Sequence, residues 1–68
     1  MKESILKFIK DLTQREIDGG VKSPQDFDLK YMLEEIRREF PLAESSLWPS
    51  DREIREVYID TFQDNDLH

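Results

Sequence analysis

Apolar side chains recur at helical spacing in three stretches of the chain, which glycine and proline separate. In the first stretch, residues 3–18, the apolar positions lie three or four residues apart, and at about 100° per residue they share one face of a helix. These positions are Ile5, Phe8, Ile9 and Leu12, with Leu6 and Ile17 beside them. Gly19 and Gly20 follow, and glycine readily takes the left-handed conformation that closes a helix. The pattern therefore predicts a first helix over 3–18.

The central stretch, residues 24–40, has a compact apolar stripe and clear signals at both ends. Its stripe comprises Leu29, Met32, Leu33, Ile36 and Phe40. Ser23 can cap a helix and Pro24 suits its first position, whereas Pro41 prevents the helix from continuing. We therefore predict a second helix over 24–40. The link from the first helix is short, which favours antiparallel neighbours, so we expect the two helices to form a helical hairpin.

A third helix is predicted over 51–62, where Ser50 and Glu53 fit an S-x-x-E capping box. Its apolar face comprises Ile54, Val57, Tyr58, Thr61 and Phe62. The tail, residues 63–68, is polar and we expect it to fray. We expect its terminal histidine, His68, to have neither a catalytic nor a ligand role, and it could be the remnant of an expression tag.

The connection at 41–49 lies between two prolines, yet it contains three large apolar residues, Leu42, Leu47 and Trp48. We predict a short helical turn at about 42–47 that folds these side chains back over one end of the core. Trp48 has two interpretations, which are packing against the core and anchoring a partner protein. Its indole N–H needs a hydrogen-bond acceptor in either case.

No stretch shows the sustained period-two alternation of β-branched residues that predicts a strand. The predicted fold is therefore all-α, a single domain over 1–68 with three helices and no sheet. A chain of 68 residues buries a small core and often gains stability from a disulfide, a metal or a second copy. Because the chain has no cysteine, self-association is the remaining route, and a homodimer is one expectation.

The net charge of −6 lies almost wholly in residues 41–68, which carry two arginines against seven acids. Such a field repels phosphate, so nucleic acid is not expected as a partner. A helix-turn-helix DNA-binding regulator is the alternative, because Arg52 and Arg55 lie near the start of the third helix. That motif needs a link of about 3–4 residues, whereas this connection has about ten, and acids flank both arginines.

Residue types that carry chemistry are scarce or poorly placed. The chain has no cysteine, its one histidine is terminal, and its sixteen acids fall on the polar faces of the predicted helices. Acid–base catalysis needs partly buried carboxylates in different surroundings. We therefore predict no enzyme, catalytic residue, cofactor, metal or small-molecule substrate. No run of about 18 apolar residues occurs, so we expect no membrane span, and the lack of cysteine fits a cytoplasmic location.

Phe27 and Tyr31 are four residues apart in the predicted second helix and point away from its main stripe, with Arg38 on the same side. They would either pack under a neighbouring segment or form a protein-binding surface, in which aromatic residues and arginine dominate. Ile59 flanks the stripe of the third helix and could lie at an interface edge. We predict a small acidic non-catalytic protein that binds another protein, as a regulator or inhibitor on a basic partner surface, and that could be homodimeric. The candidate interaction residues are Phe27, Tyr31, Arg38, Trp48 and Ile59.

Overall fold

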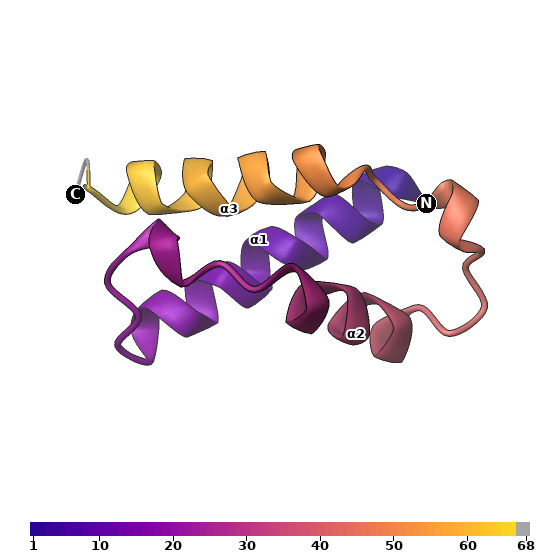
Figure 1. Ribbon diagram of the computed structural model, residues 1–68, viewed down its shortest axis with the longest axis horizontal. Helices are drawn as coiled ribbons and strands as arrows, with labels where there is room; N and C mark the ends of the chain where they lie inside the picture. Colours follow the sequence, from indigo (N-terminus) through magenta and orange to yellow (C-terminus); the bar gives the residue numbers. More distant parts are fainter. Residues whose placement is uncertain (67–68) are drawn as a thin grey trace.

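In the computed structural model, which describes residues 1–66, the chain forms three α-helices and two short 3-10 turns, with no β-strand in this range (Figure 1). The order is α1 (Lys2–Asp18), η1 (Pro24–Asp26), α2 (Leu29–Glu39), η2 (Ser45–Leu47) and α3 (Asp51–Asp66). The predicted all-α, three-helix fold is confirmed. No helix in the described range is long and apolar enough to reach across a bilayer.

α1 and α3 run in the same direction, and α2 returns antiparallel to α1 as the second arm of the predicted hairpin (Figure 1). Near the helix starts, Lys2 Nζ lies 2.7 Å from Glu53 Oε2. Near the helix ends, Asn65 Nδ2 donates to Gln14 Oε1 at 2.8 Å, and Gln14 Nε2 donates to Asn65 Oδ1 at 3.1 Å. The residues of each pair are 51 apart in sequence, so α1 and α3 keep one register between these contacts.

The hydrophobic core takes side chains from all three helices. Its buried members are Ile5, Ile9 and Leu12 of α1, Met32 and Ile36 of α2, and Ile54, Tyr58 and Phe62 of α3. Burying one such side chain contributes about 1.5–3 kcal/mol. Two threonines, Thr13 and Thr61, are also buried, and each hydroxyl donates to the carbonyl four residues earlier at 2.7 Å. Their polar atoms are therefore satisfied within their own helices.

α1 ends at the glycine pair, as predicted. Gly20 has a φ of 115°, in the left-handed region that glycine adopts without strain. Its N–H donates to the Ile17 carbonyl at 3.0 Å, and the Val21 N–H donates to the Glu16 carbonyl at 3.0 Å. These two bonds form a Schellman motif, which satisfies carbonyls that the end of a helix would otherwise leave without donors.

The predicted second helix over 24–40 is wrong in its first part, because the structure divides it. Ser23 caps only the 3-10 turn η1, and the chain is then extended at Phe27 and Asp28, with ψ angles of 126° and 100°. The Asp28 carboxylate accepts the Tyr31 N–H at 3.2 Å, which makes Asp28 the N-cap of α2. An N-cap of this type contributes about 1 kcal/mol. The α-helix thus starts at the second of two capping residues, Asp28, and not at Ser23.

α2 ends at Glu39, and Phe40 has a φ of −124°, as expected for a residue before Pro41. The Phe40 ring packs edge-on against Phe8 of α1, with the ring centroids 5.7 Å apart. The helical turn predicted at about 42–47 is the shorter η2, which starts only at Ser45. The prediction that its leucines fold back over the core is wrong, because Leu42 and Leu47 are exposed and only Trp48 packs against the core. The connection is thus mostly irregular, and Phe40 anchors its start against α1.

α3 begins with the predicted capping box. The Ser50 N–H donates to Glu53 Oε1 at 3.0 Å, and the Glu53 N–H donates to Ser50 Oγ at 3.2 Å. The helix then runs past the predicted end at residue 62, so the prediction that the tail frays from residue 63 is wrong for residues 63–66. Asn65 lies in this extension, and its side chain bonds to α1. His68 lies outside the described residues, so its prediction stays a prediction.

Candidate protein-binding groove

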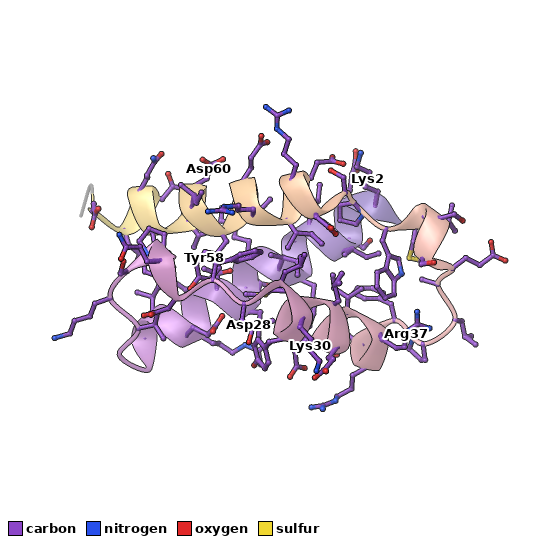
Figure 2. All side chains as sticks on the ribbon, viewed as in Figure 1. Lys2, Asp28, Lys30, Arg37, Tyr58 and Asp60 are labelled. Carbon is purple, nitrogen blue, oxygen red and sulfur yellow. The ribbon has the colours of Figure 1, made fainter. Side chains whose placement is uncertain are left out.

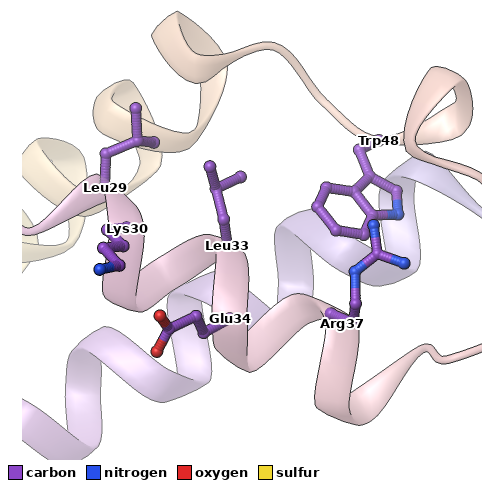
Figure 3. Close-up of a pocket in the computed structure, with 6 residues that line it drawn as sticks. All are labelled: Leu29, Lys30, Leu33, Glu34, Arg37 and Trp48. Atoms are coloured by element: carbon purple, nitrogen blue, oxygen red, sulfur yellow. The ribbon is translucent and has the colours of Figure 1, made fainter.

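A groove of about 450 Å³ opens between α2 and the connection that leads into α3. We call it the Trp48 groove; its lining residues are Leu29, Lys30, Leu33, Glu34, Arg37 and Trp48. Five of these come from α2 and the sixth faces them from the connection (Figure 3). In the close-up, Leu29 and Leu33 point from α2 towards α3, and Trp48 closes one end. The floor of the groove is therefore apolar.

Local sequence explains why this strip of α2 stays partly open. Met32 and Ile36 lie on one side of the apolar stripe and are buried in the core. Leu29 and Leu33 lie towards its other side and are only half-buried, although both touch the core. The next side chain on this side is Arg37, four residues after Leu33, and arginine keeps its charged end in water. The groove thus follows a row of residues at i, i+4 spacing.

Three charged side chains form the rim, and two of them are basic. Lys30, Glu34 and Arg37 are all exposed. The rim is therefore locally positive on a chain whose formal net charge is −6. The Arg37 guanidinium carbon also lies 5.0 Å from the centre of the Trp48 ring, a cation–π contact that helps to hold both side chains.

Trp48 packs against the core on one side and lines the groove on the other. Packing against the core, the first of the two predicted interpretations, accounts for one side of the Trp48 ring. The second interpretation, anchoring a partner protein, depends on what the groove binds. Its indole N–H is buried and has no hydrogen-bond acceptor in the structure. The acceptor that the sequence led us to expect is therefore not found among the described residues.

The predicted aromatic pair does not form one surface. Because α2 starts only at Leu29, Phe27 lies outside the helix and packs half-buried against Tyr58 of α3, with the ring centroids 5.1 Å apart. The Arg55 guanidinium lies 5.9 Å from the centre of the Phe27 ring. Tyr31 remains on α2 with 37% of its surface exposed, and it does not line the groove.

Arg38 and Ile59 also lie outside the groove. Arg38 is exposed, and its nearest acidic partner is Glu35, at 3.6 Å one turn earlier. Ile59 is half-buried on α3. Of the five predicted interaction residues, Trp48 alone lines the groove. Leu29 and Leu33 were predicted only as part of the apolar stripe, and their spacing contains no signal that separates them from the buried Met32 and Ile36.

A second feature is a pair of buried polar atoms, one on α1 and one on α3. Glu16 Oε2 and the Tyr58 hydroxyl are both buried without a hydrogen-bond partner in the structure. Burial raises the pKa of the Glu16 carboxyl, and the nearby Asp28 carboxylate raises it further. Burial also raises the pKa of the Tyr58 hydroxyl, with smaller effects from Glu16 and Asp26. Figure 2 shows Tyr58 pointing inward, whereas Asp60 of α3 points outward.

The buried Glu16 carboxyl and Tyr58 hydroxyl are not part of a cluster of metal-binding side chains among the residues that the structure describes. Within residues 1–66, no three or more His, Cys, Asp or Glu side chains come close enough together to hold a metal ion.

Comparison of the chain with models of known protein families, with curated proteins and with solved structures finds no match in any of the three.

Proposed function

We propose that this chain is a small non-catalytic protein that acts by binding another protein in the Trp48 groove. The observation that carries the proposal is the groove itself, with Leu29, Leu33 and Trp48 as an apolar floor and charged side chains at the rim. Tryptophan and arginine are enriched among the residues that dominate binding energy at protein interfaces. Apolar grooves beside a helix commonly receive apolar side chains of a partner segment.

A protein ligand fits this groove better than a small molecule does. Small-molecule sites combine apolar walls with a few fixed polar groups that converge on the ligand. The polar groups of the Trp48 groove are instead long, exposed side chains at the rim, Lys30, Glu34 and Arg37. Such flexible charged side chains can orient an extended partner surface. The apolar floor would supply binding free energy, at about 25 cal/mol for each Å² of apolar surface removed from water.

The acidic part of the chain adds a second element to the proposal. Residues 41–68 carry two arginines against seven acids, and most of these acids are exposed. This surface favours a basic patch on the partner and disfavours nucleic acid. Docking over a basic functional surface would make the protein a regulator or inhibitor of its partner, and we place this role in the cytoplasm.

The test is quantitative affinity purification from a cell extract with three baits: the unaltered chain, Leu33→Lys in the groove, and Leu6→Lys as a matched control. Leu6 is also a half-buried leucine, but it lies on α1 and does not line the groove. We expect a partner that Leu6→Lys retains and Leu33→Lys loses, with similar melting temperatures for both variants. Capture that is identical for all three baits, or no specific capture by an unaltered chain that is also monomeric, would contradict the proposal.

A further inference from the structure

Two leucines in the connection between α2 and α3 project into solvent. Leu42 is 97% exposed and Leu47 is 51% exposed, and Leu42 is the most exposed large apolar side chain among residues 1–66. The local sequence does not require this exposure, since polar residues would serve equally well at such positions. Both leucines belong to the same short segment, residues 42–47, and an exposed apolar patch is typical of a binding surface.

The backbone holds Leu42 in place and does not leave it on a loose loop. On one side, Phe40 packs against Phe8, and on the other side Ala43 is buried with 6% exposure. The Ala43 N–H donates to the Phe40 carbonyl at 3.1 Å, which closes a turn around Leu42. A side chain presented on a fixed turn loses little conformational freedom on binding, so it is well suited to insert into an apolar site.

The segment that carries these leucines complements the Trp48 groove in both polarity and charge. Between the two leucines lies Glu44, an exposed acid. The groove offers an apolar floor and a rim with two basic side chains, Lys30 and Arg37. Its volume of about 450 Å³ is larger than one leucine side chain needs. An acidic segment with two leucines is thus the kind of ligand that this groove fits, and the chain itself carries one.

We propose that the occupant of the Trp48 groove is a second copy of this chain. Leu42 and Leu47 of one copy enter the groove of the other, and Glu44 lies against the basic rim. The segment that carries the leucines starts three residues after the end of α2 and leads directly to Trp48, which lines the groove. Figure 1 shows this connection between the end of α2 and the start of α3. A two-fold axis then repeats the same contact in both directions. This inference rests on the proposed function, because it names the partner of the same groove.

Light scattering after size-exclusion chromatography tests the proposal on the full chain, at concentrations from about 10 μM to about 1 mM. We expect a concentration-dependent dimer that Leu42→Ser weakens about a hundredfold or more, because each dimer loses two leucine contacts. Tyr31→Ser is the matched control, since Tyr31 is an exposed apolar residue outside the groove. Trp48 is the single tryptophan, so its fluorescence should shift on dimerisation.

A mixing experiment identifies the two halves of the contact. Leu42→Ser keeps an intact groove and Leu33→Lys keeps intact leucines, so a mixture of the two variants can rebuild one of the two contacts. We expect each variant alone to be monomeric and the mixture to form a heterodimer weaker than the unaltered dimer. A chain that is monomeric at every concentration, or a dimer that Leu42→Ser leaves unchanged, overturns the inference. If a monomeric chain still captures a partner that Leu33→Lys loses, the proposed function stands and only the second copy as occupant is rejected.

Discussion

The α1–α3 interface and the outer side of α2 contain similar apolar residues, but these residues are buried to different extents. Between α1 and α3, Ile5, Ile9, Ile54 and Tyr58 are all completely buried. On the outer side of α2, Leu29 and Leu33 remain half-buried and line a groove. Composition alone therefore does not decide which apolar residues become core. The length and register of the opposing element decide it.

Helix length accounts for the difference. α1 has 17 residues and α3 has 16, whereas α2 has 11. At a rise of about 1.5 Å per residue, α1 and α3 are each about 25 Å long and α2 is about 16 Å long. The two long helices cover each other from end to end, as their contacts near both ends indicate. The short helix cannot seal the same length, and irregular chain around Trp48 covers the remainder.

The largest expected effect is a difference in stability loss between the two regions. It is measured with a matched pair of truncations, Ile54→Ala and Leu33→Ala. Ile54 is 0% exposed in the α1–α3 interface, so its truncation leaves a cavity and should cost about 3 kcal/mol or more. Leu33 is half-buried, and its truncation should cost about 1 kcal/mol. Urea denaturation measures both. Equal losses would mean that the two regions are packed alike.

The next effect concerns the hydrogen bonds between Gln14 and Asn65, which close the far end of the same interface. Asn65→Ala should cost about 1 kcal/mol, because the amide also donates to the Thr61 carbonyl at 2.8 Å. A double-mutant cycle with Gln14→Ala should give a coupling of about 0.5–1 kcal/mol. Gln63→Ala, an exposed change on the same helix, is the control and should have almost no effect. Zero coupling would place α3 apart from α1 at this end.

Glu16→Gln should stabilise the fold at neutral pH, by up to about 1 kcal/mol. Since folding raises the pKa of Glu16 above its ordinary value of 4.5, the carboxyl favours the folded state when protonated. Its contribution is complete below pH 4.5 and is lost as the pH rises through the raised pKa. The advantage of glutamine should thus be present at neutral pH and vanish below pH 4.5. Asp11→Asn, at an exposed position on α1, controls for the change in net charge. No difference between Glu16→Gln and the unaltered chain at any pH would count against burial of this carboxyl.

The smallest effect is expected for Tyr58→Phe. The ring is completely buried, but its hydroxyl has no hydrogen-bond partner in the structure. Removing a buried hydroxyl without a partner should change the unfolding free energy by less than about 1 kcal/mol, in the direction of higher stability. Thermal melts of the two proteins at equal concentration measure this. A clear loss of stability would mean that the hydroxyl is bonded in solution, for example to a buried water molecule.

The sequence predicted helix ends well where one local signal acts alone. The glycine pair after Asp18, the capping box at Ser50 and the proline after Phe40 each act within one turn of the chain, and the structure has a helix end at each. The prediction of a helix end failed where two signals compete. Ser23 and Asp28 can both cap a helix, and the choice between them depends on Phe27 packing against Tyr58, which lies 31 residues further along the chain.

The groove was harder to predict for a similar reason. Leu29 and Leu33 belong to the same apolar stripe as Met32 and Ile36, and nothing in their spacing separates them. They differ only in what packs against them in the folded chain, where Trp48 lines the groove beside Leu29 and Leu33. Trp48 itself was identified from the sequence, because a simple link between two prolines would not need three large apolar residues.

The parallel pairing of α1 with α3 has a consequence for how the chain folds. The contacts that join these helices connect residues 51 positions apart, so they close loops that span most of the 68 residues. Folding rates fall as native contacts become more distant in sequence. On a ribosome, α1 and α2 would emerge before α3 with one side of their apolar surface bare, and only the arrival of α3 would cover it. This helical domain should therefore fold only once α3 has emerged, and more slowly than a helical bundle in which each helix packs against the next.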